Sequence, residues 1–364
     1  MRKIALLLLL PLFFSCNTPP EEDPQSWEEA RPLHEIYQDY FLMGNIISPG
    51  DLNNTARFNY LKRHFNTLTA ENHMKPDNIA PSAKGGPYRW DNADRIITAA
   101  TAEGIKVVGH TLIWYSQTPG WLTTGNKAAV EENLEKYVTD VVTHFKGKLI
   151  SWDVVNEAMR DGLSEGDAAD WKNCLRPLKE NGWAVIGPEY IEKAFLAARK
   201  ADPDVKLYYN DYNLNNAAKA RAAYNMVNDI NKKYPNEGGR PLIDGIGMQS
   251  HHHLTTNPQT VENSINLFAS LEVEVAISEM DIQAAGNNLP GGAVTWGDDA
   301  AQRQAAQYAA MFKIIKKHSD KISRVTFWGI DDGTSWRSST HPTLLDKDYH
   351  LKPAFYAVMD PNRY

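Results

Sequence analysis

The sequence predicts a single α/β domain folded as a closed (β/α)8 barrel, the TIM-barrel architecture. Eight short β-rich runs alternate with amphipathic stretches of helical spacing, and no linker or low-complexity tract interrupts residues 27–364. Almost every β-rich run ends in a polar or aromatic residue, as expected where barrel strands deliver side chains to one face. A doubly wound open sheet is the alternative, but Gly44 and Gly50 after the first run form no phosphate-binding glycine motif.

The predicted strands and helices follow one another along the chain. The strands are expected to end near Asn45, Thr69, His110, Asn156, Asn210, Gln249, Glu279 and Trp328. Amphipathic helices are expected over residues 91–103, 127–145, 188–200, 217–233 and 300–318. Pro188 suits the first turn of its helix, because a backbone N–H would have no helical partner at that position.

The composition is typical of a folded domain with an acidic surface. The chain has 364 residues, of which 42% are hydrophobic and 23% charged, so it contains enough apolar material for a large core. Asp and Glu number 45 against 38 Lys and Arg, which gives a net charge of −7. This balance does not attract polyphosphates, so no nucleic-acid partner is expected.

The first residues indicate an export signal of the lipoprotein type. Arg2 and Lys3 precede an apolar run, residues 4–14, that is shorter than the roughly 20 residues of a membrane-spanning helix. The ending Leu-Phe-Phe-Ser-Cys resembles a bacterial lipobox, which implies cleavage before Cys16 and lipidation of that residue. Ordinary signal cleavage nearby, with an unmodified cysteine, is the alternative.

Three segments are therefore expected along the chain. A signal peptide occupies residues 1–15, a lipidated cysteine and a flexible acidic, proline-rich tether occupy 16–26, and the barrel domain occupies 27–364. Cys174 is then left without an intramolecular disulfide partner and is interpreted as a structural loop residue. We expect an exported, membrane-anchored protein at the outer membrane or cell surface.

Two glutamates end the fourth and seventh predicted strands. Glu157 and Glu279 each follow an apolar run, within WDVVNEA and VAISEMD respectively. A lone strand-end glutamate is usually a salt-bridged or capping residue, but two on one barrel converge on the same face. Acetal cleavage needs a proton donor and a group that stabilises an oxocarbenium-like centre, which two carboxyl groups supply. A separation of about 5 to 5.5 Å gives retention of configuration and a wider one inversion, and the sequence leaves this distance open.

Seven ordered segments resemble glycoside hydrolase family 10, a family of retaining endo-β-1,4-xylanases. They are LTAENHMKP (68–76), VGHTLIWYSQTPGW (108–121), WDVVNEA (152–158), YYNDYN (208–213), IDGIGMQSHHH (243–253), VAISEMDI (275–282) and VTFWGIDDGTSWR (325–337). The resemblance implies that Glu157 is the general acid/base and Glu279 the nucleophile. It also implies xylan and xylo-oligosaccharides as substrates, with no cofactor.

The resemblance assigns supporting roles to polar residues near the two glutamates. It implies that His251 hydrogen-bonds the nucleophile, that Asp281 holds His251, and that Asn156 reaches the 2-hydroxyl of the sugar at the cleavage point. The further expected substrate-binding residues are Glu71, Asn72, Lys75, His110, Trp114, Tyr212, Gln249, Trp328 and Trp336. Without the resemblance, the polar residues of 71–75 equally fit the start of a helix.

Aromatic residues carry the expected preference for xylan. Tryptophan in a barrel is more often core than platform, but Trp328 and Trp336 follow the last strand in loops rich in Gly and Asp. The resemblance places both rings over the cleavage-point sugar, where they would disfavour a 6-hydroxymethyl group. Xylose lacks that group, so xylan is favoured over cellulose.

Three consecutive histidines, His251, His252 and His253, invite interpretation as a metal site. Neighbouring residues of an extended segment point to opposite faces, so three adjacent imidazoles do not easily converge on one ion. No catalytic metal is therefore expected.

The sequence departs from the family pattern in three places. Tyr115 replaces a common His, and Ser278 and Met280 flank the nucleophile where Thr and Leu are usual. Neither change replaces a catalytic group, so rate or pH optimum is in question rather than activity. The segment 160–183 is longer than a minimal member needs. Its two tryptophans, at 171 and 183, either extend the leaving-group side of the cleft or pack on the barrel.

Two other functions stay open at this point. One is a related barrel glycosidase acting on cellulose or mixed-linkage glucan. The other is a non-catalytic xylan-binding lipoprotein that uses the same cleft, although the presence of both Glu157 and Glu279 argues against it. The expected partners are xylan and, through the lipid anchor, a membrane, and we expect a monomer.

Overall fold

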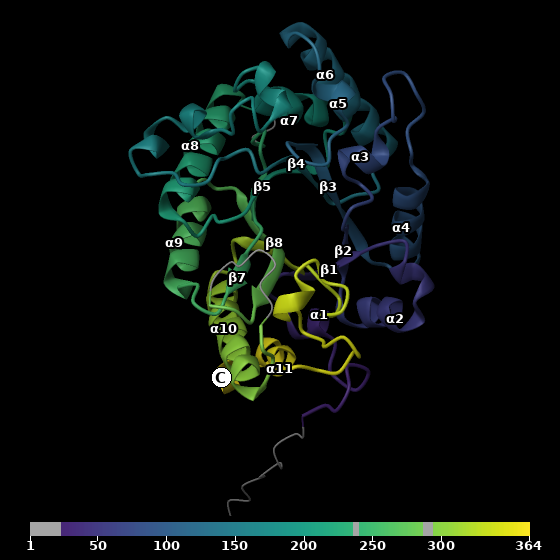
Figure 1. Ribbon diagram of the computed structural model, residues 1–364, viewed down its shortest axis with the longest axis vertical. Helices are drawn as coiled ribbons and strands as arrows, with labels where there is room; N and C mark the ends of the chain where they lie inside the picture. Colours follow the sequence, from purple (N-terminus) through teal and green to yellow (C-terminus); the bar gives the residue numbers. More distant parts are fainter. Residues whose placement is uncertain (1–22, 236–239, 287–293) are drawn as a thin grey trace, which may run out of the picture.

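The computed structural model describes residues 23–235, 240–286 and 294–364 and confirms the predicted closed barrel (Figure 1). Within these residues eight parallel strands close a ring in the order β1-β2-β3-β4-β5-β6-β8-β9, with β9 paired onto β1. Their bounds are β1 Leu42–Ile47, β2 Thr67–Ala70, β3 Lys106–Trp114, β4 Ser151–Asn156, β5 Lys206–Asp211, β6 Gly245–Met248, β8 Glu274–Gln283 and β9 Ile322–Phe327. Because neighbouring strands are parallel, their carboxyl ends all meet at one face.

A further short strand, β7 (His251–His253), was not predicted from the sequence. It pairs in parallel with the carboxyl-terminal part of β8, with His251 opposite Asp281. β6 pairs with the earlier part of β8 and ends at Met248. β6 and β7 therefore both pair with β8, one after the other. This path brings His251 beside Asp281, two residues after Glu279.

Two strands extend beyond their predicted ends. β3 runs past His110 to Trp114, because its last residues continue to pair with β4, Trp114 lying opposite Asn156. β8 runs past Glu279 to Gln283, because β7 pairs with this part of it. As a result, Trp114 and Glu279 lie on strands, whose hydrogen bonds fix their backbones more firmly than a loop would.

Helices surround the strands (Figure 1). Their bounds are α1 Leu33–Ile36, α2 Thr55–His64, α3 Pro76–Ile79, α4 Asp91–Ala102, α5 Gly120–Thr123, α6 Lys127–His144, α7 Tyr190–Ala201, α8 Ala217–Lys233, α9 Pro258–Ala269, α10 Asp298–Lys317 and α11 Pro353–Met359. Short 3-10 helices are η1 Asp51–Asn53, η2 Asp167–Ala169, η3 Trp171–Cys174, η4 Gly182–Val185, η5 Ser338–Thr340 and η6 Pro361–Arg363. Among the described residues no helix combines the length and apolar character needed to cross a membrane.

The five predicted helices correspond to α4, α6, α7, α8 and α10, with small shifts at their ends. The prediction for Pro188 was wrong in detail. The N-cap of α7 is Glu189, so Pro188 lies one residue before the cap. Its carbonyl accepts a hydrogen bond from the Ile191 N–H at 3.3 Å, so the proline belongs to the turn that leads into α7.

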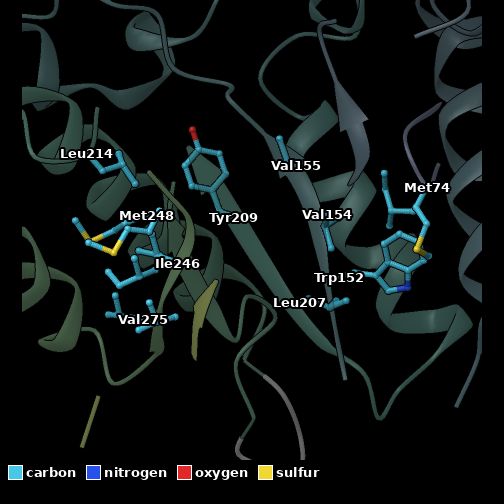
Figure 2. Close-up of a cluster of buried hydrophobic side chains, with 14 of the residues drawn as sticks. Met74, Trp152, Val154, Val155, Leu207, Tyr209, Leu214, Ile246, Met248 and Val275 are labelled. Carbon is cyan, nitrogen blue, oxygen red and sulfur yellow. The ribbon is translucent and has the colours of Figure 1, made fainter. Parts of the chain in front are cut away.

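Apolar side chains from the strands, together with residues of the loops and helices, form a continuous core (Figure 2). The residues labelled there are Met74, Trp152, Val154, Val155, Leu207, Tyr209, Leu214, Ile246, Met248 and Val275. Trp152 of β4 depends on a glycine in the neighbouring strand. A Cβ atom at Gly109 would lie well under 3.0 Å from the Trp152 ring, so only glycine leaves room for the indole.

Both ends of the described chain lie at the amino end of the barrel, opposite the face that carries the two glutamates. α10 ends at Lys317 shortly before β9 begins, so its last turn lies at this end. Lys313 in α10 donates to the backbone oxygen of Tyr364 at 2.6 Å. Arg363 in turn forms a salt bridge with Asp23, the first described residue.

The last part of the predicted tether contacts the barrel. Besides the ion pair of Asp23 with Arg363, the Tyr356 hydroxyl of α11 donates to the backbone oxygen of Pro24 at 2.9 Å. The prediction of a wholly unpacked tether was therefore wrong for these residues. The remainder of that tether, Cys16 and the predicted signal peptide lie outside the described residues.

Candidate active site

Glu157 and Glu279 both lie at the carboxyl-end face of the barrel, as the sequence predicted. Glu157 directly follows β4, and Glu279 lies within β8. They are 9% and 5% exposed, so both carboxyl groups are largely removed from water. Buried carboxyl groups need hydrogen-bond partners, and the surrounding strands supply them.

Glu157 accepts hydrogen bonds from three neighbouring side chains. Gln249 donates from Nε2 to Oε1 at 2.9 Å, Asn156 from Nδ2 to Oε1 at 3.3 Å, and Trp114 from Nε1 to Oε2 at 3.0 Å. Burial raises the pKa of Glu157, and the negative charges of Asp211 and Glu279 raise it further, against the hydrogen bonds from Gln249 and Trp114. A carboxyl group with a raised pKa keeps its proton, as a general acid must.

Glu279 has the opposite surroundings. Asn210 donates from Nδ2 to its Oε1 at 2.7 Å, His251 from Nε2 to its Oε2 at 3.3 Å, and His110 Nδ1 lies 4.0 Å from Oε1. Burial alone would raise the pKa of Glu279, but the His251 hydrogen bond and the proximity of His110 and Asn210 together lower it. Glu279 is therefore held as a carboxylate, the form that a nucleophile requires.

Amide side chains link the two glutamates. The Asn156 Oδ1 atom accepts from Asn210 at 2.9 Å and from Gln249 at 3.2 Å. Asn210 also bonds Glu279, and Gln249 also bonds Glu157, so one network reaches both carboxyl groups. The network fixes the orientation of each carboxyl group before substrate arrives.

His251 lies between Glu279 and Asp281. His251 Nδ1 lies 3.0 Å from Asp281 Oδ2, at an angle outside the hydrogen-bond range, while its Nε2 faces Glu279. Burial lowers the pKa of His251, but Asp281 and Glu279 outweigh it and raise the pKa to about 9. Asp281 also accepts from Trp336 Nε1 at 2.9 Å and forms an ion pair with Arg337 at 3.3 Å. His251 is therefore a cation held between two carboxylates.

His110 connects the site to the barrel interior. Its Nδ1 lies 2.9 Å from Asp153 Oδ2, and its ring meets that of Trp328 edge-on, with centroids 5.3 Å apart. Arg324 in turn lies 3.5 Å from the second oxygen of Asp153. These contacts hold the imidazole of His110 in place beside Glu279.

The residues after β2 converge on the same site. Lys75 Nζ donates to Asn72 Oδ1 at 2.8 Å and lies 5.0 Å from the centroid of the Trp114 ring. Burial lowers the pKa of Lys75, opposed by the charges of Glu279, Glu71 and Glu157. Burial also raises the pKa of Glu71. The proximity of Lys75 to both glutamates favours the sugar-binding interpretation over a plain helix start.

The two tryptophans after β9 differ in exposure. Trp328 is 5% exposed and its ring packs against that of His110, whereas Trp336 is 55% exposed. The Trp336 indole is held by its N–H bond to Asp281 and by the Arg337 guanidinium, which lies 4.2 Å from its ring centroid. An exposed ring with a fixed orientation is suited to stacking against a sugar.

Tyr212 lies beside the site rather than within the network that links the glutamates. Its hydroxyl accepts from Arg176 Nη2 at 2.6 Å and donates to Asp161, and Lys219 Nζ lies 3.6 Å from the ring centroid. Arg176 also donates to the backbone oxygen of Glu157 at 2.9 Å. Tyr212 therefore connects to Glu157 through Arg176.

Both tryptophans of the segment 160–183 pack on the barrel. Trp171 donates to Asp229 Oδ2 and Trp183 to the backbone oxygen of Trp114, each at 3.0 Å, and both rings are buried. Of the two alternatives for these rings, the packing one is correct. Cys174 is buried in the same segment, as expected of a structural residue.

Sequence reasoning left out several residues that complete the site. Asn210 was noted as a strand end but not as a partner of Glu279, and Arg176 was not singled out. The sequence signal for Asn210 was that it ends the fifth predicted strand, as Asn156 ends the fourth. In the structure these two residues lie opposite each other on β5 and β4. No local pattern marked Arg176, because its contacts join distant parts of the chain.

The predicted site residues do not form a metal cluster. Within the described parts of the chain, the one group of His, Asp or Glu with suitable spacing is Asp346, Asp348 and His350, and it contains none of them. His252 is buried, and burial lowers its pKa to about 3, so it is neutral. The exposure of the three consecutive histidines alternates along β7, as expected for an extended segment.

A barrel that carries two buried carboxyl groups with opposite pKa shifts at its carboxyl-end face has the catalytic groups of a glycosidase. Residues 32–361 match Glycosyl hydrolase family 10. The chain belongs to that family.

Relatives and solved structures of similar sequence support this membership. The chain is 39% identical to a beta-1,4-xylanase of Dictyoglomus thermophilum, over 98% of this chain and 97% of the relative. It is 37% identical to endo-1,4-beta-xylanase A of Thermotoga maritima, over 94% of this chain but 31% of that longer protein. The crystal structure of an Ig-like-domain-containing GH10 xylanase from termite gut has a TM-score of 0.85 and 38% identity, covering 94% of this chain and 80% of that one.

Proposed function

We propose that this protein is an endo-1,4-β-xylanase that hydrolyses internal xylosidic bonds of xylan with retention of configuration. The observation that carries the proposal is the opposite environment of two carboxyl groups in one hydrogen-bond network. Burial raises the pKa of Glu157, while hydrogen bonds and nearby imidazoles lower the pKa of Glu279 despite burial. One group is therefore a proton donor and the other a carboxylate nucleophile.

In the first step, Glu157 donates its proton to the glycosidic oxygen while Glu279 attacks the anomeric carbon. The carbon–oxygen bond to the leaving sugar breaks, and an ester forms between Glu279 and the xylosyl unit. His251 and Asn210 hydrogen-bond the Glu279 carboxylate and keep it ionised and oriented until attack. Asn156 lies beside both groups and can meet the 2-hydroxyl, where hydrogen bonds strengthen in the transition state.

In the second step, Glu157 acts as a base. Once Glu279 is an ester its negative charge is gone, so the pKa of Glu157 falls and its carboxylate form becomes favoured. Glu157 takes a proton from water as that water attacks the anomeric carbon, and Glu279 departs as a carboxylate. Two inversions at the same carbon restore the original configuration.

The tryptophan pair supports xylan over cellulose as the substrate. Trp328 is buried and Trp336 is held by Asp281 and Arg337, so neither ring moves easily to admit a 6-hydroxymethyl group. Rates on xylohexaose and cellohexaose test this preference. Faster cleavage of cellohexaose would identify the related glucan hydrolase, and binding of xylan without release of reducing ends would identify a non-catalytic protein.

We also propose that the mature protein begins at a lipidated Cys16 and is held at the outer membrane or cell surface. The basic and apolar residues before Cys16 and the acidic tether after it support this. The ion pair between Asp23 and Arg363 adds support, because it fastens the start of the domain at the barrel end opposite the glutamates. The proposed segments remain 1–15, 16–26 and 27–364.

Fractionation of cells that express the wild type and Cys16→Ala tests the anchor. Wild type should sediment with membranes and incorporate labelled fatty acid, and Cys16→Ala should do neither. A soluble, unlabelled wild type would refute the anchor without affecting the catalytic proposal. We propose a monomer, which light scattering of the protein lacking residues 1–22 should report as one chain.

A further inference from the structure

We infer that Arg176 and Tyr115 form a positioning pair that holds the carboxyl group of Glu157 in the geometry its acid/base role requires. The inference rests on the proposed function, because it takes Glu157 as the acid/base. Neither residue reacts with the substrate in this view. Both act through Glu157.

The backbone of Glu157 needs external support. Its φ of 54° lies in the left-handed region, which residues with a Cβ atom rarely adopt and which persists when surrounding structure enforces it. The Glu157 N–H donates to the backbone oxygen of Asn210 at 2.8 Å. Its carbonyl accepts from Arg176 Nε at 2.9 Å. Strand β5 therefore holds the peptide unit before the Glu157 Cα atom, and Arg176 holds the peptide unit after it.

Arg176 reaches Glu157 because the segment 160–183 folds back along the residues after β4. The Arg176 N–H donates to the Ala158 oxygen at 2.9 Å, and Met159 pairs with Leu175 in an antiparallel bridge. The Arg176 side chain is 8% exposed, so it is fixed between the segment and the barrel. The long segment thus delivers one buried guanidinium to the backbone of the acid/base.

Tyr115 is the second member of the pair and packs against Arg176. The Arg176 guanidinium carbon lies 4.2 Å from the centroid of the Tyr115 ring, a cation–π contact that orients the ring. Burial raises the pKa of Tyr115, and the charge of the neighbouring Glu157 raises it further. The Tyr115 phenol therefore stays neutral, and a neutral polar group near Glu157 favours the carboxylate form that acts as a base.

Charge alone does not account for this arrangement. The titratable and charged groups that face Glu157 are Asp211, Glu279, Lys75, Tyr115 and Arg176. A lysine at 176 would keep the positive charge but lose the fork whose Nε and Nη2 bond the Glu157 carbonyl and Tyr212 together. Arg176→Lys therefore removes the hydrogen bonds that position Glu157 while it keeps the positive charge.

The test compares Arg176→Lys and Tyr115→Phe on two substrates across pH. Xylohexaose needs its leaving group protonated, whereas a 2,4-dinitrophenyl xylobioside needs little help from an acid. Arg176→Lys should lower kcat/KM roughly 10- to 100-fold on xylohexaose and less than about threefold on the aryl substrate. Tyr115→Phe should move the alkaline limb of kcat/KM on xylohexaose upward by roughly half a pH unit to one unit, because Glu157 loses a nearby polar group that favours its carboxylate form.

Arg160→Lys is the matched control. Arg160 lies on the same segment and forms an ion pair with Asp167 at 3.3 Å, so its replacement should leave the wild-type kinetics unchanged. An Arg176→Lys variant with wild-type values on both substrates, or with equal losses on both, would overturn the inference. Equal losses would mean a general structural role.

A Glu157→Ala variant keeps this failure distinct from failure of the proposed function. If it hydrolysed xylohexaose at the wild-type rate, the acid/base assignment itself would be wrong. If it were inactive while Arg176→Lys behaved as wild type, only the positioning role would fall. Should Arg176→Lys not fold, as judged by circular dichroism, the pH profile of Tyr115→Phe decides: an unmoved alkaline limb would overturn the inference.

Discussion

Asn210 of β5 lies opposite Gly247 of β6, and the missing side chain at Gly247 leaves the space that the Asn210 amide occupies. A Cβ atom at position 247 would lie well under 3.0 Å from Asn210 Oδ1. The same amide donates to Glu279 at 2.7 Å and to Asn156 at 2.9 Å. A glycine on one strand therefore determines how a hydrogen-bond donor on the next meets the nucleophile.

Gly247→Ala should therefore damage catalysis although it adds one methyl group. Displacement of Asn210 should lower kcat on xylohexaose roughly 10- to 100-fold, because small misplacements at a reacting centre are costly. Asn210→Ala should cause a loss of similar size by removing the amide itself. A wild-type kcat in folded Gly247→Ala, with its thermal unfolding temperature measured alongside, would contradict this relationship.

Glu279→Ala should abolish turnover and preserve binding. The proposed mechanism forms the glycosyl ester on Glu279, so release of reducing ends from xylan should fall by roughly 10⁴-fold or more. Calorimetric titration with xylohexaose should still report binding near the wild-type affinity. Retained turnover would show that Glu279 is not the nucleophile.

Glu157→Ala should be rescued in part by azide. Its rate on xylan should fall roughly 10²- to 10⁴-fold, the usual contribution of a general acid/base. On an activated aryl xylobioside, azide should restore activity, because the anion attacks the glycosyl ester without needing a base. The product should be a β-xylobiosyl azide, detectable by mass spectrometry, and Glu279→Ala run in parallel should form none of this β-linked product.

The pH profile should depend on His251. The hydrogen bond and charge of His251 help to keep the pKa of Glu279 below its ordinary value. Removing them in His251→Asn raises that pKa, so the nucleophile is protonated at higher pH and the acid limb of kcat/KM moves upward. We expect a shift of about one unit, since hydrogen bonds to charged groups are worth about 1.5–3 kcal/mol. An unmoved acid limb would separate His251 from the ionisation of Glu279.

The same histidine should contribute to the pH dependence of stability. Asp281 and Glu279 raise the pKa of His251 from 6.5 to about 9, against the effect of burial. The folded state therefore binds this proton more tightly than the unfolded chain, and the stabilisation is complete below about 6.5 and lost as pH rises through 9. Urea unfolding at pH 6 and pH 9.5 should show a larger decrease in the free energy of unfolding for wild type than for His251→Asn.

Much of the fold and both glutamates could be predicted from the sequence. The alternation of β-rich and amphipathic stretches reflects local hydrophobic periodicity, which the final structure preserves. Glu157 and Glu279 stood out because each follows an apolar strand, and parallel strands carry their ends to one face. The short strand β7 escaped detection, because three histidines carry no hydrophobic pattern and pair with the extension of β8.

The supporting contacts could not be predicted, because they depend on three-dimensional proximity. Arg176 and Tyr212 are separated by 36 positions yet share a 2.6 Å hydrogen bond. Trp171 and Trp183 fitted either a cleft or a core until their N–H partners were known. A glycine such as Gly247 has no chemistry of its own, and its importance emerges from the side chain across the strand.

The configuration of the first product tests most directly whether the two glutamates act as acid/base and nucleophile. Proton NMR of xylohexaose during the first minutes of hydrolysis resolves the anomeric protons of the newly formed reducing ends. A double displacement through Glu279 should give the β-anomer first, followed by slow appearance of the α-anomer through mutarotation. Initial formation of the α-anomer would mean direct attack by water and would contradict the role of Glu279 as a nucleophile.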